Sequence, residues 1–320
     1  MSSHRPFLVG VGCAAVALGV ALASLEPGSL FTSMTSADVF VFEQILLPRV
    51  LIALIAGASL ALSGAVFQSL TRNPLGSPDI LGFTQGAATG ALIGVTVLGG
   101  STLLVAGSAW IGAVISAAVV YFVARRGGIT GGTRLVLVGI GVAAMLGGVN
   151  DYLMTRANIS DAAQAAVWIT GSLDGSTWNS VTLLAVASAV LMPCVILTSR
   201  ALRILEMGDD LAIGLGIRAE RLRLLALAGA VILAATAASQ TGPVAFVALC
   251  APHVARRLTR ATGPNLVPSL LVGSVLLVGA DWLARYGIPN RELPVGAVTG
   301  LLGGGYLAYL LAQQRRIGRI

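Results

Sequence analysis

The sequence predicts an all-α membrane protein that crosses the bilayer many times within one domain, residues 1–320. Two features of its composition predict this. The chain has many hydrophobic residues (56%) and few charged ones (10%), and its mean hydropathy is high, at +0.89. A soluble domain carries about 25% charged residues. The third observation is that the apolar residues form continuous runs, without the alternation typical of a membrane β-strand. We therefore expect a polytopic bundle of helices.

Ten apolar runs supply the predicted transmembrane helices. A helix rises about 1.5 Å per residue, so about 20 apolar residues cross the roughly 30 Å of hydrocarbon. The ten predicted spans cover residues 7–25, 50–70, 80–98, 102–124, 135–154, 180–198, 222–240, 243–258, 266–284 and 294–312.

The eighth run, 243–258, is short, and the distribution of arginine justifies counting it. All 20 basic residues of the chain are Arg. Cytoplasmic loops of membrane proteins carry an excess of basic residues. Ten spans with the N-terminus inside satisfy this rule, and omitting the eighth moves more arginines outward than inward. The rule predicts both termini on the cytoplasmic side of the plasma or inner membrane, with four arginines outside: Arg49, Arg156, Arg285 and Arg291.

The first run leaves an alternative open. Arg5, the apolar stretch and Ala21-Leu22-Ala23 before Ser24 also fit a cleavable signal peptide. Cleavage would leave nine spans. The apolar part of a signal peptide is about 7–15 residues long, and the run 7–25 is longer, so we favour a first span.

The residue inventory excludes several kinds of chemistry. The chain contains no Lys, and a phosphate-binding P-loop requires one, so this chain is not expected to hydrolyse ATP. Its three cysteines all lie within predicted spans, and neither they nor its two histidines show metal-ligand spacing. The acids lie in loops or near span ends, and we expect Asp281 to pair with Arg285, four residues on. We therefore expect no catalytic residue, metal or cofactor in this chain. We also expect no nucleic-acid binding, because the arginines are spread through loops.

The longest predicted cytoplasmic loop, about residues 199–223, contains the most charged stretch of the chain, Glu206–Arg223. Asp209 or Asp210 is suited to cap a short helix there. We expect Leu211, Ala212 and Leu215 to share an apolar face, with Gly214 and Gly216 ending the helix. A small apolar patch in a polar loop indicates a protein-docking surface. A solvated loop is the alternative.

Three stretches carry ordered motifs: Gly57–Ala91, which contains Asn73-Pro74-Leu75; Gly242–Leu258, which contains Pro252-His253; and Arg291–Leu311. Together they resemble the FecCD family of permeases, which import iron chelates and cobalamin. The likeness runs from about Gln44 to Leu311, and several ordered motifs at matching spacing make it specific.

The resemblance implies a ten-helix permease subunit with the fold of vitamin B12 importers, in which spans two to five and seven to ten are inverted repeats. The parity of the spans agrees with this. The implied partners are a second permease subunit, identical or similar, two cytoplasmic ATPase subunits that bind ATP and Mg²⁺, an extracytoplasmic solute-binding protein and membrane lipids. A ferric siderophore is the expected cargo, and haem and cobalamin are the alternatives.

The resemblance also assigns roles to particular residues. Leu205–Gly216 resembles the family's coupling helix, so we expect contact with the ATPase from Asp209, Asp210, Leu211, Ala212, Leu215 and Gly216. Arg49 and Arg285 match basic positions that receive acidic residues of the binding protein. Two constrictions of a cytoplasmic gate are implied, one from Asn73 and Leu75 and the other from Gly132 and Thr133.

Two functions from other classes stay as alternatives. An ion-coupled secondary transporter would need an acid in the middle of the membrane, and none is visible in the sequence. An intramembrane enzyme would need a convergent cluster of His, Ser or acidic residues, and none is visible either.

Overall fold

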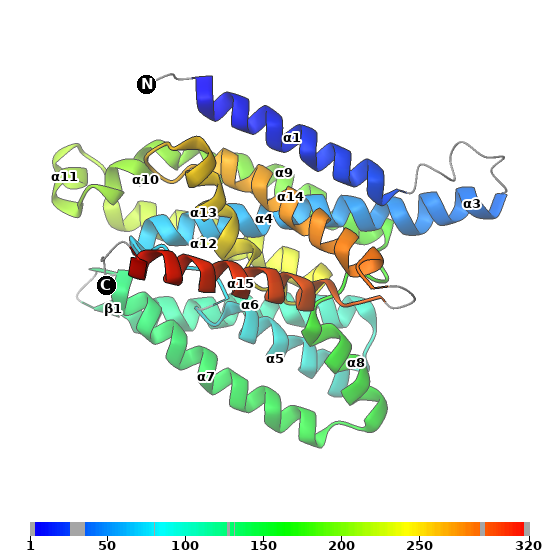
Figure 1. Cartoon of the computed structure of the whole chain (residues 1–320). Helices are drawn as coiled ribbons and strands as arrows, with labels where there is room; N and C mark the ends of the chain where they lie inside the picture. The colour runs from blue at the N-terminus through cyan, green and yellow to red at the C-terminus, as the bar shows by residue number, and fades with distance from the viewer. Residues whose placement is uncertain are drawn as a thin grey trace.

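The computed structural model describes residues 4–25, 36–79, 81–126, 129–130, 132–288 and 292–316. Within these residues the chain is a bundle of helices with one two-stranded hairpin (Figure 1). The hairpin pairs β1 (Arg125–Arg126) with β2 (Ile129–Thr130) in antiparallel orientation. The predicted all-α class is confirmed.

The helices follow the predicted spans in order. The first half of the chain forms α1 (His4–Ser24), α3 (Ser36–Val41), the π-helical turn η1 (Phe42–Leu46), α4 (Leu47–Thr71), α5 (Phe83–Thr96), α6 (Thr102–Ala124), α7 (Gly132–Arg156) and α8 (Ile159–Thr170). The second half forms α9 (Trp178–Leu197), α10 (Ser199–Glu206), α11 (Asp209–Gly214), α12 (Ala219–Thr241), α13 (Val247–Thr259), α14 (Leu266–Tyr286) and α15 (Val295–Arg316). The sequence did not predict α3, α8 or α10.

Six helical segments of the described chain are long and apolar enough to cross a membrane: Ser36–Thr71, Thr102–Ala124, Thr133–Arg156, Trp178–Leu197, Ala219–Thr241 and Leu266–Tyr286. The apolar helical stretches Leu8–Ser24 and Val295–Tyr309 are shorter. The predicted count of ten spans is therefore not established. The largest departures are the predicted spans 80–98 and 243–258, which contain helices of 14 and 13 residues, α5 and α13.

Both short helices begin at a residue in the left-handed conformation. The residue before α5 is Gly82 (φ 83°), and the residue before α13 is Phe246 (φ 67°). Pro78 and Pro243 lie just upstream, and proline cannot donate a backbone hydrogen bond. Each predicted span therefore starts as an irregular loop and becomes helical only after this turn. At about 1.5 Å per residue, neither helix alone crosses the hydrocarbon.

Helix α4 lies at the centre of the bundle and α7 at its edge (Figure 1). Every residue from Ala56 to Thr71 on α4 is buried, whereas α7 is mostly exposed. Small residues permit the close contacts. Gly57 of α4 lies against the backbone of Gly273 on α14, and Gly86 of α5 lies against Gly112 on α6, so that a Cβ at these sites would collide with backbone. Such contacts let helices approach closely in lipid.

The helix lengths repeat along the chain. Helices α4 to α7 have 25, 14, 23 and 25 residues, and α12 to α15 have 23, 13, 21 and 22.

The start of α1, the end of α15 and the pair α10–α11 lie at the same end of the bundle, and α3 lies at the other (Figure 1). We call these the α11 end and the α3 end.

Candidate functional site

At the α11 end, the charged stretch forms the short helix α11 with an exposed apolar patch. Leu211, Ile213 and Leu215 are 45%, 62% and 62% exposed. The helix ends at Gly214, and Gly216 follows in the left-handed region (φ 79°), as predicted. We call the three exposed side chains the α11 patch. Exposed apolar side chains gathered in this way can serve as a surface on which another protein docks.

Two details of α11 differ from the prediction. Ala212 does not share the exposed face: it is fully buried in the core of its own chain. Leu211 lies about 100° from Ala212 around the helix, and Leu215 is already the C-cap, beyond the last helical residue Gly214, so it need not follow the face of Ala212. The cap was also wrong. Gly208 is the N-cap and makes no side-chain hydrogen bond, and Asp209 and Asp210 lie in the first turn.

The carboxylate of Asp209 points toward the bundle and binds two arginines. Arg223 of α12 donates to both carboxylate oxygens, at 2.7 and 2.8 Å, and Arg72 at the end of α4 also donates to it. The hydrogen bonds from Arg223 are the main reason that the pKa of Asp209 is lowered, and Arg72 acts in the same direction. Asp209 therefore stays ionised at neutral pH. Asp210, beside it, is exposed.

The first predicted gate segment directly follows Arg72. Asn73 and Leu75 form a tight turn in which the Asn73 Oδ1 accepts a hydrogen bond from the Leu75 N–H (2.9 Å). Leu75 is 44% exposed, and the His253 Nε2 donates to the Pro74 carbonyl at 2.9 Å. We call Asn73–Leu75 the gate loop. Beside it a cleft of about 360 Å³ opens, lined also by Glu206 and Gly263.

The second predicted gate segment lies at the start of α7. Gly132 is the first residue of that helix, and Thr133 is exposed. No hydrogen bond or ion pair joins these two residues to the gate loop within the described part of this one chain. Their role in a gate stays a prediction, because the predicted gate forms between two permease chains.

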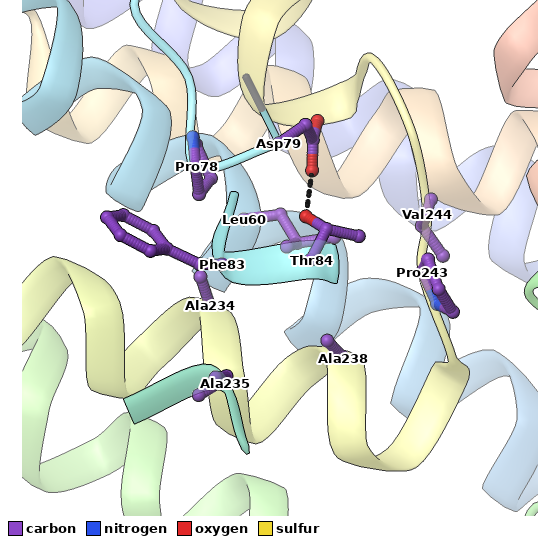
Figure 2. Close-up of a pocket in the computed structure, with 11 residues that line it drawn as sticks. Leu60, Pro78, Asp79, Phe83, Thr84, Ala234, Ala235, Ala238, Pro243 and Val244 are labelled. Carbon is purple, nitrogen blue, oxygen red and sulfur yellow. Dashed lines mark hydrogen bonds between the residues drawn. The ribbon is translucent and has the colours of Figure 1, made fainter. Parts of the chain in front are cut away.

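Inside the bundle, the loops that precede α5 and α13 meet at Asp79. Figure 2 shows the Asp79 side chain directed at Thr84, whose Oγ1 donates to it at 2.8 Å. The backbone of Phe246 also hydrogen-bonds to Asp79. Leu60 and Ala234, from the interior of α4 and α12, line the same pocket. Asp79 belongs to a loop, as the sequence indicated, but this loop folds back among the helices.

This interior pocket is too small to hold a transported solute. Its volume is about 10 Å³, which is at most the space of one water molecule. The described residues contain no group of three or more His, Cys, Asp or Glu side chains placed to hold a metal ion. We therefore interpret the Asp79 contacts as a joint between the two loops.

At the α3 end, Arg49 and Arg285 lie in a buried ionic network. Arg49 bonds to Asp174 (2.6 Å) and Asp281 (2.9 Å), and Glu292 lies at 3.7 Å. Arg285 lies 3.4 Å from Asp281, which confirms the predicted pair, and donates to the Ser24 carbonyl at 2.9 Å. Asp281 is 1% exposed.

The burial of both arginines bears on their predicted docking role. The side chains of Arg49 and Arg285 are 9% and 6% exposed, so neither offers a free guanidinium at the surface. The exposed members of the network are the acids Asp174 and Glu292. Docking through Arg49 stays a prediction, and it requires these acids to move aside.

Comparison with known proteins decides the family. The model of the FecCD transport family matches residues 7–313, nearly the whole chain. The chain belongs to the FecCD transport family.

Individual relatives agree with this. This FecCD protein is 44% identical to the ferric enterobactin transport system permease protein FepG of Escherichia coli over 270 residues, covering 84% of this chain and 82% of the relative. It is 36% identical to the Fe(3+)-citrate import system permease protein YfmE of Bacillus subtilis over 306 residues, covering 94% and 91%. A solved structure described as an inward-facing metal-chelate type ABC transporter matches with a TM-score of 0.86 and 26% identity, over 95% of this chain and 99% of that one.

Sequence reasoning missed several members of these sites. Arg72 and Arg223 bind Asp209 from 137 and 14 residues away, and Asp79 meets Phe246 across a long stretch of chain. Asp174 is 125 residues from Arg49. No local pattern reports such contacts. The one available signal was the scarcity of charge, because a charged residue in so apolar a chain requires a partner.

Proposed function

We propose that this FecCD protein is the permease subunit of an ABC importer that takes up an iron chelate, a ferric siderophore, from a solute-binding protein. The family match over residues 7–313 carries the proposal. FepG and YfmE, named for ferric enterobactin and Fe(3+)-citrate, support iron chelates as the cargo class. The chain forms one permease domain in the inner membrane.

The α11 patch is the proposed docking surface for a cytoplasmic ATPase subunit. Leu211, Ile213 and Leu215 extend from a helix whose other side is fixed to the bundle by Ala212 and Asp209. Two ATPase subunits supply the energy, and they bind the ATP and Mg²⁺. The chain itself has no Lys for a P-loop. The α11 end is then cytoplasmic, and both termini lie on that side.

A second permease chain completes the translocation path. Gly141 and Gly148 of α7, and Gly300 and Gly304 of α15, face open space in this chain, so a Cβ there would meet no atom. Small residues on exposed transmembrane helices suit close contact with another helix. We place these helices at the contact with an identical or similar permease, with the gate loop and Gly132–Thr133 around the shared axis.

The repeated helix lengths support two inverted repeats, α4–α7 and α12–α15. Each repeat has a short helix in second place, and the loops that lead into the two short helices meet at Asp79. Transporters built from inverted repeats commonly place discontinuous helices at the repeat interface. The extracytoplasmic binding protein then delivers the chelate at the α3 end, where Arg49 and Arg285 lie.

The experiment is co-purification followed by an ATPase assay. The chain is co-expressed with an ATPase and a binding protein from the same genome, purified, and assayed with the binding protein loaded with a ferric siderophore, haem or cobalamin. We expect a stable complex whose ATP hydrolysis rises with the siderophore-loaded protein. A rise with haem or cobalamin alone would move the cargo to that class. Failure to retain any ATPase would overturn the assignment.

A further inference from the structure

The side chain of Asp209 joins the coupling helix to the gate loop. Asp209 opens α11, and its carboxylate accepts from Arg72. Arg72 is the residue immediately before the gate loop and forms the left-handed end of α4 (φ 48°). The Arg72–Asp209 ion pair therefore connects α11, the helix proposed to face the ATPase, with the start of the gate loop.

The same guanidinium also holds the segment before α11. Arg72 Nη2 donates to the Leu205 carbonyl of α10 at 2.7 Å. Arg72 thus contacts the chain on both sides of Met207 and Gly208. A displacement of α10 and α11 moves both of its partners together.

Arg223 makes the second bond of Asp209 and serves a different purpose. It is 9% exposed and donates to both carboxylate oxygens, so it fixes α11 to α12. When Arg72 is replaced, Asp209 still binds Arg223, so α11 remains attached to α12. The contact of Arg72 is therefore separable from the folding of the coupling helix.

The gate loop is a stiff turn. Pro74 restricts its backbone, and the Asn73 side chain closes the turn onto the Leu75 N–H. The 360 Å³ cleft beside it leaves space for displacement. Two side chains also donate to its backbone: His253 to the Pro74 carbonyl and Thr71 to the Asn73 carbonyl.

The ion pair itself adds little to stability. The side chains of Arg72 and Asp209 are 42% and 36% exposed, and exposed ion pairs contribute little to folding stability. Its removal leaves the buried core of α4 and α12 intact. The ion pair matters because it connects α11 with the gate loop.

We infer that the Arg72–Asp209 ion pair transmits the movement of α11 to the gate loop, so that Arg72 and Asp209 are positioning residues for gating. The inference rests on the proposed function, because it requires an ATPase that moves α11. It predicts that breaking the pair separates ATP hydrolysis from transport. It also predicts that the ATPase stays bound.

The test compares Arg72→Gln and Asp209→Asn with Arg260→Gln in the complete importer in proteoliposomes. Arg260 is the matched control, because it is also an exposed arginine at a left-handed helix end (φ 52°) and none of the ion pairs found in the described chain involves it. The readouts are ATPase co-purification, ATP hydrolysis stimulated by the loaded binding protein, and chelate uptake per ATP.

We expect both variants to retain the ATPase and to hydrolyse ATP. Uptake per ATP should fall about fivefold or more, in line with usual coupling energies. The double variant should be no worse than Asp209→Asn alone, because Asp209→Asn already removes the ion pair that Arg72→Gln breaks. Arg72→Lys, which keeps the charge, should restore much of the uptake, and Arg260→Gln should match the unmodified chain.

The gate itself gives a second readout. The variant Leu75→Cys should crosslink between two permease subunits in the resting state, and less so when the ATPases are trapped with nucleotide. In the Arg72→Gln background this change with nucleotide should be lost.

Three results would overturn the inference while leaving the proposed function in place. They are loss of the ATPase from Arg72→Gln, uptake equal to that of the unmodified chain in both single variants, and additive losses in the double variant. A complex that never forms with the unmodified chain would instead reject the proposed function.

Discussion

Arg49 holds three carboxylates at the α3 end and is almost completely buried. Asp281, its most buried partner, also lies near Arg285. A buried ion pair contributes little net stability over apolar residues, yet removing one partner leaves an uncompensated charge. The network therefore makes Arg49 a structural residue in this conformation, whatever its part in docking.

We predict that Arg49→Met lowers the stability of the purified permease by about 3 kcal/mol, the lower end of the range for a broken buried pair, because Arg285 still compensates part of the Asp281 charge. The measurement is thermal unfolding in detergent, followed by size-exclusion chromatography. The control is Arg156→Met, since Arg156 is exposed and contacts the Tyr152 ring. Equal midpoints for both variants would show that the network is not structural.

The acids around Arg49 give a test of docking that does not disturb the arginine. Asp174 and Glu292 are 59% and 64% exposed, so Asp174→Asn with Glu292→Gln should fold normally. If an acidic residue of the binding protein bonds to Arg49, removing these competitors should raise affinity a few-fold at low salt, the usual scale for exposed charge pairs. Binding kinetics with the immobilised binding protein measure this, and weaker binding would place the docking contact elsewhere.

At the scale of elements, α11 separates into two faces. Leu215 is exposed beside Leu211, whereas Ala212 is enclosed by the core. A charge on the exposed face affects a partner, and a charge on the buried face affects this chain. The two faces therefore predict different defects from the same substitution.

We predict that Leu215→Asp inserts and folds normally but loses the ATPase and chelate uptake, because a buried unpaired charge costs several kcal/mol at a contact. Ala212→Asp should instead lower the thermal stability of the isolated permease. Pull-down of the ATPase and unfolding in detergent separate the two. An ATPase that stays bound to Leu215→Asp, with uptake intact, would reduce the segment to a solvated linker.

The loops before α5 and α13 form the second element-scale feature. Asp79→Leu leaves the Thr84 hydroxyl and the Phe246 N–H without their acceptor, at a cost of about 1–3 kcal/mol. Asp79→Asn keeps an acceptor oxygen and should be milder. Thermal midpoints of the two variants test the joint. A midpoint for Asp79→Leu equal to that of the unmodified chain would show that the joint does not hold the loops together.

Long apolar runs made much of this fold predictable. The spans at 102–124 and 266–284 differ from α6 and α14 by at most two residues, because uniform hydrophobicity favours uninterrupted helices. The predictions were less accurate at 80–98 and 243–258, where backbone turns at Gly82 and Phe246 interrupt residues that are just as apolar. Hydropathy carries no information about φ.

Some of the candidate functional residues were also predictable from the sequence, and others were not. The sequence located the exposed segment around α11, since charge stands out in an apolar chain, and it placed Gly214 and Gly216 correctly at the end of the helix. It did not reveal that Asp209 turns inward to Arg72, because that contact spans 137 residues. Family resemblance supplied the position of Asp209, and only the fold supplied its partner.

At the scale of the molecule, the structure connects its two ends through α4. This buried helix carries Arg49 near the α3 end and Arg72 at the α11 end, and Arg72 leads into the gate loop. In the proposed importer, the binding protein acts at the first end and the ATPase at the second. Helix α4 lies between them and packs against α12 and α14.

Uptake of radiolabelled iron by proteoliposomes tests the central claim most directly. The vesicles contain the chain with its ATPase and partner permease, and the loaded binding protein is added on the side of the α3 end. We predict accumulation of the ferric siderophore that requires hydrolysable ATP and persists when proton and sodium gradients are collapsed. Accumulation driven by an ion gradient without ATP would contradict the account and identify a secondary transporter.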